Sequence, residues 1–255
     1  MCSKQETLKG YSSLKAIQIL EANSTDHQGM TLKKVSDDTG LSPSTVHRIM
    51  QELTECGYTR KTADGKFQIG FDTMELAMRV KASDYLVEIS LDEMTRLNDL
   101  TGETIHLINQ DGDRGVYIGK LEAKNTVGLK SRVGKSTPLY CTSGGKIILA
   151  YQDEKWLTNY LNNLEMVSYT KYTLSSKEKL LEELEQIRTQ GYSLDNREYN
   201  EDVICIAAPV FGKNGRFKFT ISIAAPSYRF SLEKAKSYSD EVIKSSKLIS
   251  EKLNE

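Results

Sequence analysis

The sequence predicts an α+β protein, in which a small helical domain with a β-hairpin precedes a larger domain of mixed strands and helices. Three observations predict this organisation. Two short helical segments flank a glycine corner early in the chain, and a hairpin rich in cations follows them. After residue 103 the apolar residues change from a helical period to the alternation typical of strands.

The stretch from Met30 to Met50 (MTLKKVSDDTGLSPSTVHRIM) is typical of two short helices around a tight corner. Thr31 is the expected N-cap of the first helix, and Gly40 ends it because glycine tolerates the left-handed conformation. Ser42 and Pro43 start the second helix as N-cap and first helical residue. The apolar residues of the second helix that we expect to be buried are Val46, Ile49, Met50 and Leu53.

That burial leaves an outer face near the start of the second helix. Its members are short, polar or cationic: Ser42, Ser44, Thr45, His47 and Arg48. A helix-turn-helix needs this arrangement, because the early residues of its second helix enter the major groove of DNA. The alternative is an ordinary helical hairpin with a solvated face.

A predicted β-hairpin follows directly and favours the first interpretation. Tyr58–Thr62 and Lys66–Ile69 are expected strands, and Asp64-Gly65 is the expected two-residue turn. A cationic hairpin behind a recognition helix is a wing. We expect Arg60, Lys61 and Lys66 to reach phosphates or the minor groove, and Thr31 completes the predicted DNA-binding residues.

The totals are those of an ordinary globular chain, with 38% hydrophobic and 27% charged residues and a net charge of −1. No apolar run approaches the length of a membrane span, and the N-terminus (MCSKQETLKG) has no apolar signal region, so we expect a cytoplasmic protein with no membrane partner. The four cysteines lack paired metal spacing and are expected to be reduced thiols: Cys2, Cys56, Cys141 and Cys205. Neither a metal nor a cofactor is predicted.

Three segments organise the chain: a winged helix-turn-helix domain at 1–70, a linker helix at 71–83 and a second domain at 84–255. Residues 1–10 are an expected frayed leader, and Tyr11–Asn23 is an amphipathic helix with Leu14, Ile17, Leu20 and, as a further candidate, Ala16 facing inward. The stretch 71–83 equally fits the first helix of the second domain.

The second domain is expected to alternate strands and helices. Predicted strands cover 104–109, 115–121, 127–133, 192–197, 203–211 and 216–224, with turns at Asp111-Gly112 and Asn214-Gly215. Predicted helices cover 84–100, the end of 136–150, 153–162, a segment capped near Ser175 and Ser176, and a final helix capped by Ser231. This order is typical of an α+β sheet domain.

No catalytic arrangement is found, and we do not expect an enzyme. The three histidines do not suggest a Ser/His/Asp trio, and Thr142–Lys146 lacks the upstream glycine and the final Ser/Thr of a phosphate loop. The same Ser143-Gly144 run at a helix start is suited to an anion, because free amides and the helix dipole favour negative charge. A loop that needs small residues for packing is the competing interpretation. Asp195, Cys205 and Ser222 lie on or beside predicted strands, and Cys205 is by default a core residue.

The order of these parts resembles the IclR family of bacterial transcription regulators. The segments that carry the resemblance are GLSPSTVHRIMQEL (Gly40–Leu53), GKSTPLYCTSGGKIILA (Gly134–Ala150), VICIAAPVF (Val203–Phe211) and ISIAAP (Ile221–Pro226). It extends from about Tyr11 to Leu253.

The resemblance implies a GAF-like effector-binding C-terminal domain, homodimers often paired into homotetramers, and double-stranded operator DNA as partner. It also implies a small-molecule effector, commonly a carboxylate, sugar acid or aromatic acid. The matched effector positions are Ser143, Gly144, Asp195, Cys205 and Ser222. We therefore predict an effector-modulated transcriptional regulator, with repression favoured over activation. The alternative is a ligand-sensing oligomer that acts mainly through protein contacts and uses its helix-turn-helix to dimerise.

Overall fold

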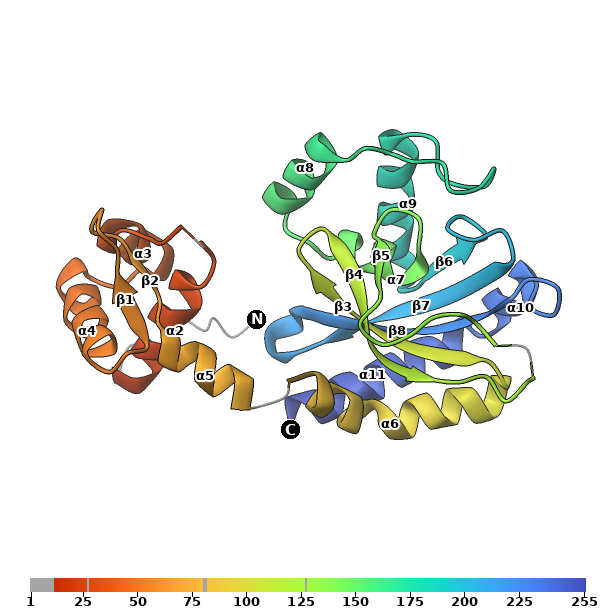
Figure 1. The fold of residues 1–255 in the computed structure, drawn as a ribbon, viewed down its shortest axis with the longest axis horizontal. Coiled ribbons are helices and arrows are strands. Elements are labelled where there is room, and N and C mark those ends of the chain that lie inside the picture. Colours follow the sequence, from red (N-terminus) through yellow and green to blue (C-terminus); the bar gives the residue numbers. More distant parts are fainter. Residues whose placement is uncertain (1–11, 27, 80–81, 127) are drawn as a thin grey trace. The chain divides into compact units, whose positions relative to one another are not determined.

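The computed structural model describes residues 12–26, 28–79, 82–126 and 128–255 (Figure 1). The chain divides into two compact units, Met1–Ala82 and Ser83–Glu255, and each contains a hydrophobic core of its own. The expected leader at 1–10 lies outside the described residues, and the domain limits at 70/71 and 83/84 stay predictions. None of the described helices is long and apolar enough to cross a lipid bilayer.

The first unit packs three helices around a small core: α2 (Ser12–Asn23), α3 (Leu32–Thr39) and α4 (Pro43–Glu55). The inward face predicted for α2 is wrong for Leu14 and Ile17, which are 37% and 53% exposed, whereas Ala16 packs against the core and Ile19 is fully buried. The Gln18 amide donates to the Thr39 carbonyl at 2.9 Å, which fixes the rotation of α2 against the end of α3. The buried apolar residues of this core are Ile19, Met30, Val35, Val46, Ile49, Met50 and Phe67.

The corner between α3 and α4 has the predicted caps. The Thr31 hydroxyl accepts the Lys34 amide at 3.3 Å, and Gly40 adopts a φ of 67° past the end of α3. Ser42 accepts the Thr45 amide at 3.3 Å and Pro43 occupies the first turn of α4. These caps satisfy helix-end groups that would otherwise lack partners, so the sequence defines both helix ends locally.

The wing consists of β1 (Thr59–Lys61) and β2 (Phe67–Ile69), which pair antiparallel. The predicted two-residue turn is wrong. The Thr62 amide donates to the Lys66 carbonyl at 2.8 Å, which leaves a three-residue loop at 63–65. Gly65 has a φ of 80°, and three-residue hairpin loops commonly end with a residue in this left-handed region.

Met30 forms an isolated antiparallel β-bridge with Phe67 of the wing. Its amide donates to the Phe67 carbonyl at 2.8 Å, and the Phe67 amide donates back to the Met30 carbonyl at 2.9 Å. Met30 directly precedes Thr31, the N-cap of α3. The wing is therefore joined by backbone hydrogen bonds to the segment that starts the helix-turn-helix.

Two helices follow the wing, α5 (Phe71–Arg79) and α6 (Ala82–Thr101). The predicted linker helix at 71–83 thus corresponds to α5 and the first residues of α6, and residues 80 and 81 lie outside the described part of the chain. Three apolar side chains of α5 are exposed: Phe71 at 68%, Met74 at 52% and Leu76 at 54%.

The second unit is built on a six-stranded antiparallel sheet with the strand order β5-β4-β3-β8-β7-β6. The long central strands are β3 (Thr104–Asp111), β4 (Arg114–Leu121), β7 (Val203–Phe211) and β8 (Phe217–Pro226). The two edges are short, β5 (Ser136–Pro138) and β6 (Ser193–Asn196). A 3-10 turn, η1 (Lys213–Gly215), joins β7 and β8. The predicted α+β class is confirmed.

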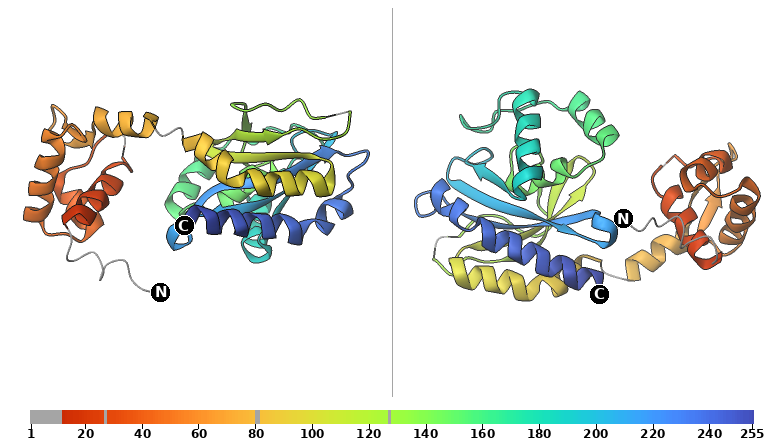
Figure 2. Two further views of the ribbon diagram at one scale, coloured as in Figure 1. Left: turned by 90° about the horizontal axis from the view of Figure 1, so that it is seen from below. Right: turned by 180° about the vertical axis from the view of Figure 1, so that it is seen from behind.

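Helices cover both faces of this sheet (Figures 1 and 2). On one face, α6, α10 (Leu232–Ser237) and α11 (Ser239–Asn254) pack on apolar residues that include Ile105, Leu107 and Ile221. On the other face, α7 (Ser143–Ala150), α8 (Glu154–Asn163) and α9 (Lys177–Gln190) pack on Ile108 and Ala207. The strands alternate between two apolar cores, because successive side chains point to opposite faces.

Two predicted elements differ in the structure. The strand expected at 127–133 is absent from the described residues 128–133, because the Lys120 ammonium donates to the Leu129 and Ser131 carbonyls at 3.1 and 2.8 Å in place of a neighbouring strand. The final helix begins after the expected cap Ser231 but breaks at Tyr238 into α10 and α11.

Candidate nucleic-acid interface and ligand cavity

The first turn of α4 presents short polar side chains at the surface. Ser42, Ser44, His47 and Arg48 are exposed, and Thr45 is half-buried. The Ser42 hydroxyl lies 3.1 Å from that of Ser44 and 2.8 Å from that of Thr45. This side is opposite the helix face that buries Val46, Ile49 and Met50 in the core. The predicted recognition face thus exists as an exposed surface, and its role in reading DNA stays a prediction.

Arg48 is held by an ion pair that the sequence analysis did not identify. Its Nη1 lies 2.6 Å from Glu52 Oε1, one helical turn further along, and the two side chains are 56% and 57% exposed. The pair holds the guanidinium along the surface of α4. A base or phosphate of DNA must therefore share Arg48 with Glu52 or displace the carboxylate.

The cations of the wing do not share one face. Arg60 lies opposite Gln68 and Lys61 opposite Phe67, so Arg60 and Lys61 point to opposite sides of the hairpin. The Lys61 ammonium lies 5.8 Å from the centroid of the Phe67 ring. At the tip, Lys66 Nζ lies 3.0 Å from Asp64 Oδ2. One DNA backbone can therefore meet Arg60 or Lys61 directly, but not both from the same side.

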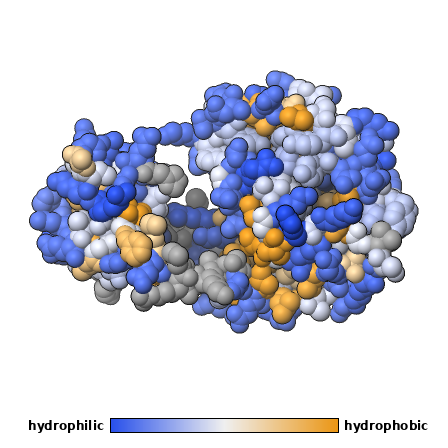
Figure 3. Space-filling model, viewed as in Figure 1, coloured by the Kyte–Doolittle hydropathy of each residue, from blue (hydrophilic) through white to orange (hydrophobic). Residues whose placement is uncertain are grey.

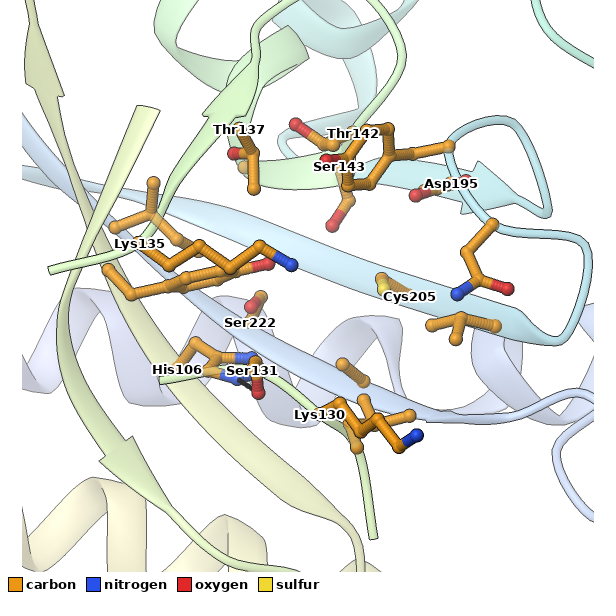
Figure 4. Close-up of a pocket in the computed structure, with 18 residues that line it drawn as sticks. His106, Lys130, Ser131, Lys135, Thr137, Thr142, Ser143, Asp195, Cys205 and Ser222 are labelled. Carbon is orange, nitrogen blue, oxygen red and sulfur yellow. Dashed lines mark hydrogen bonds between the residues drawn. The ribbon is translucent and has the colours of Figure 1, made fainter. Parts of the chain in front are cut away.

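A cavity of about 150 Å³ lies on the α7 face of the sheet in the second unit (Figure 4). Asp195 in β6 lies opposite Cys205 in β7, and Ser222 in β8 lies opposite His106 in β3. Side chains that are direct cross-strand partners point to the same face, so the register brings residues distant in sequence together. All five predicted effector residues line this cavity: Ser143, Gly144, Asp195, Cys205 and Ser222.

The N-terminus of α7 forms one wall of the cavity. The Thr142 hydroxyl caps the helix by accepting the Gly145 amide at 3.2 Å. Within the described residues, the amides of Ser143 and Gly144 have no hydrogen-bond acceptor. Unpaired amides at a helix start carry partial positive charge, so this wall favours an anionic group.

Asp195 is the acidic residue among those that line the cavity, and only 3% of its surface is exposed. Its Oδ1 accepts the Glu198 amide at 2.7 Å. Burial, reinforced by the nearby Glu198 carboxylate, raises the pKa of Asp195 to about 8. The carboxyl therefore holds its proton at neutral pH and can donate a hydrogen bond to a ligand.

A buried ion pair supports this wall from behind. Lys146 in α7 is fully buried, and its Nζ lies 2.6 Å from Glu198 Oε1. Glu183 of α9 contacts the same ammonium. Glu198 precedes Tyr199 and Asn200, which line the cavity, so Lys146 joins α7 to the β6–β7 connection.

The opposite wall contains residues that the sequence analysis did not select. His106 is 1% exposed, and its Nε2 lies 2.7 Å from Ser131 Oγ. Burial and the charge of Lys120 lower the pKa of His106 to about 3, so the ring is neutral. Lys130 lies beside Ser131 on this wall, and Lys135 lines the cavity between Thr137 and Ser222 (Figure 4). The alternation of side chains along β3 was the available signal that His106 faces the cavity. Lys130 and Ser131 were not selected because a strand was expected at 127–133.

Cys205 lies on the floor of the cavity, between the two walls (Figure 4). Burial raises the pKa of its thiol well above the ordinary value, although a hydrogen bond with the Ser143 side chain opposes the shift. The group is therefore a neutral thiol. A thiol is a poor nucleophile, because the thiolate is the reactive form. Cys205 contributes surface and shape to the cavity.

Comparisons with known proteins agree with the two-unit architecture. Residues 79–251 match the family model described as the bacterial transcriptional regulator IclR C-terminal domain, and residues 12–63 match that of the IclR helix-turn-helix domain. The chain is 35% identical over 228 residues to the HTH-type transcriptional regulator KdgR of Escherichia coli, covering 89% of this chain and 86% of KdgR. It is 31% identical over 236 residues to the DNA-binding transcriptional repressor YiaJ of the same organism, covering 90% and 83%.

A solved structure of an IclR protein matches the fold over nearly the whole chain. The IclR of Thermotoga maritima superimposes with a TM-score of 0.65 at 32% identity, covering 94% of this chain and 98% of that one. The matched family and relatives are regulators, which confirms the expectation that the chain is not an enzyme. The helix-turn-helix match identifies DNA as a partner. The chain therefore belongs to the IclR family of bacterial transcriptional regulators.

Proposed function

We propose that this chain is a homo-oligomeric repressor that acts in the cytoplasm and whose operator binding is modulated by a small carboxylate or sugar acid. The effector binds in the cavity of the second unit. The observation that carries the proposal is the convergence of the two unpaired α7 amides with Asp195, Cys205 and Ser222 around one cavity. The name of YiaJ, a repressor, supports repression over activation.

The chemistry of the cavity favours an acid with hydroxyl groups. The Ser143 and Gly144 amides provide donors for a carboxylate, and protonated Asp195 adds a donor without a negative charge. The Ser222 hydroxyl can donate or accept. A space of about 150 Å³ is the size that holds a six-membered ring of carbon atoms, so the enclosed part of the ligand is small.

Exposed apolar side chains support self-association. In the first unit, Ile17 of α2 and Phe71 of α5 are 53% and 68% exposed. In the second unit, Leu91, Leu100 and Val133 are exposed, and hydrophobic residues are visible on its surface (Figure 3). Contiguous exposed apolar patches commonly mark interfaces. A two-fold oligomer predicts a roughly palindromic operator with half-sites separated by whole turns of DNA.

Fluorescence anisotropy with labelled DNA from upstream of the gene tests the proposal. A shuffled fragment of the same composition is the control, and the titration is repeated over a salt series. We expect tighter binding to the native fragment and a steep salt dependence, because contacts with phosphates release counterions. Carboxylates and sugar acids are then added, and an effector releases the native fragment.

Two outcomes would contradict the proposal. Equal, weak binding to both fragments, with and without the acids, would favour a module that acts through protein contacts. Tight binding that no acid alters, combined with no heat of binding when the same acids are titrated into the free protein, would exclude the effector class.

A further inference from the structure

We propose that the effector carries two acidic groups, one held at the N-terminus of α7 and the other by Lys130 and Lys135, which also line the cavity. This inference rests on the proposed function and specifies the ligand of the same site. The walls face each other across the floor formed by β7 and β8 (Figure 4). In that view Thr142, Ser143 and Asp195 lie on one side, and His106, Lys130 and Ser131 on the other.

The two lysines are free to bind a ligand. Within the described part of the chain, neither ammonium takes part in an ion pair or a hydrogen bond, although both side chains line the cavity. Figure 4 shows the amino group of Lys135 directed toward the centre of the cavity. By contrast, Lys120 in the same region is fully engaged by the Leu129 and Ser131 carbonyls and by Glu122.

The segment that carries these lysines is held against the sheet. The Gly134 amide donates to the Tyr117 carbonyl at 2.8 Å, and the Tyr117 amide donates to the Lys135 carbonyl at 3.2 Å. Ser131 is held by His106, and Lys120 binds the carbonyls on either side of Lys130. The lysines thus project from an anchored backbone, which reduces the entropy lost when they bind an anion.

A buried polar atom on the same wall lacks a partner. His106 is 99% buried and lines the cavity, and its Nδ1 makes no hydrogen bond within the described residues. Buried polar groups without partners are rare in native proteins, and bound ligands or water usually satisfy them. Nδ1 itself is enclosed by protein atoms, so His106 serves the cavity through Nε2, which positions Ser131 beside Lys130.

The lining residues offer cationic partners for more than one acidic group. Lys130 and Lys135 contribute two positive charges, and Asp195 is neutral while it holds its proton. The amides of α7 add partial positive charge at the other end. Both lysines are exposed, so one carboxylate at the amides would leave them in contact with solvent, whereas a second acidic group could pair with them.

Isothermal titration of the full-length protein with matched acids tests this inference. Succinate and glutarate are compared with their monoamides, succinamate and glutaramate, which keep the length and remove one charge. 2-Phosphoglycolate is included to separate a second carboxylate from a phosphate. We expect the best dianion to bind about tenfold or more tightly than its monoamide, because hydrogen bonds to charged groups are the stronger ones.

Variants of the two lysines test whether these side chains cause the difference in affinity between dianion and monoamide. Lys130→Gln and Lys135→Gln should reduce the preference for the dianion and leave the affinity of the monoamide unchanged. Arg132→Gln is the matched control, because Arg132 lies between the two lysines, is exposed and does not line the cavity. An equal loss in Arg132→Gln would show a long-range charge effect and overturn the inference.

The result also separates this inference from the proposed function. Binding of monoamide and dianion with equal affinity would overturn the second acidic group and keep the carboxylate site at α7. Failure of every acid of two to six carbons to bind would overturn both.

Discussion

Lys146 and Glu198 form an enclosed ion pair, with 2.6 Å between Nζ and Oε1, that joins the first turns of α7 to the β6–β7 connection. The lysine side chain is fully buried and the glutamate side chain is 8% exposed. Both elements contribute lining residues to the cavity, so the pair sets the distance between two parts of its wall. A charge buried this deeply is stable only while its partner is present.

Removal of one member of this pair should therefore destabilise the second unit. We expect Glu198→Gln to lower the free energy of unfolding by about 3–5 kcal/mol, because it leaves Lys146 with only the partly exposed Glu183. Chemical denaturation followed by circular dichroism measures the change. Lys124→Met is the control, since the Lys124–Asp99 pair is exposed and should contribute no more than about 1 kcal/mol. Similar losses in both variants would contradict the role of burial.

Effector affinity should depend on pH through Asp195. The carboxyl keeps its proton up to a pKa of about 8, so an anionic ligand meets a neutral donor at pH 7 and a carboxylate at pH 9. We expect carboxylate affinity to fall as the pH rises through 8, measured by calorimetry in buffers of equal ionic strength. Asp195→Asn should bind without this dependence. A pH profile that is the same in both proteins would exclude Asp195 as the titrating group.

The same pKa also predicts a trend in stability. In the unfolded chain the Asp195 carboxyl loses its proton near the ordinary value of 3.8, whereas the folded protein holds it to about 8. Folding is therefore favoured most by this group below pH 4, and its contribution decreases as the pH rises to 8. Asp195→Asn should flatten the stability profile between these limits, measured by denaturant midpoints across pH. If the slope of stability against pH is the same in Asp195→Asn, groups other than Asp195 cause the pH dependence.

The Ser222 hydroxyl should be required for the effector response and not for DNA binding. It lies on the cavity floor in β8, within the second unit, while the predicted recognition surface belongs to the first unit. We expect Ser222→Ala and Asp195→Ala to bind operator DNA near normally without effector and to fail to release it when effector is added. Anisotropy measures both properties. Loss of effector-free DNA binding in both variants would instead show a structural role.

Arg48 should contribute to specific DNA recognition. If it reads a base, Arg48→Ala should weaken operator binding by about 1–3 kcal/mol, and should weaken binding to shuffled DNA much less. Glu52→Gln frees the guanidinium from its ion pair and should retain the preference for the operator. Competition between native and shuffled fragments measures the specificity. Unchanged operator binding in Arg48→Ala would show that the recognition face is assigned wrongly.

The sequence predicts those parts of the fold whose signals are local. Gly40, Ser42 and Pro43 define the helix-turn-helix corner because each acts through its own backbone conformation or cap. Rotation of α2 was mispredicted, because the bond from Gln18 to the end of α3 depends on a neighbour 21 residues away. The strand expected at 127–133 failed for the same reason, since the Lys120 side chain replaces the pairing that a strand would need.

The cavity shows the same division between local and distant signals. Ser143 and Gly144 could be identified from a helix start, and Asp195, Cys205 and Ser222 from the family resemblance. The opposite wall depends on register: His106 reaches the site only because it lies across from Ser222. The raised pKa of Asp195 depends on Glu198 and on enclosure by several elements, which no local pattern contains.

The backbone bridge between Met30 and Phe67 has a consequence for how the first unit unfolds. An isolated two-stranded hairpin is only marginally stable in water and frays easily. Here the wing shares hydrogen bonds with the chain that leads into α3, so its amides should exchange with solvent only when that segment also opens. The wing and the helix-turn-helix then form one cooperative unit of hydrogen exchange. The conformational entropy of the hairpin is therefore lost when the unit folds and not when it binds DNA.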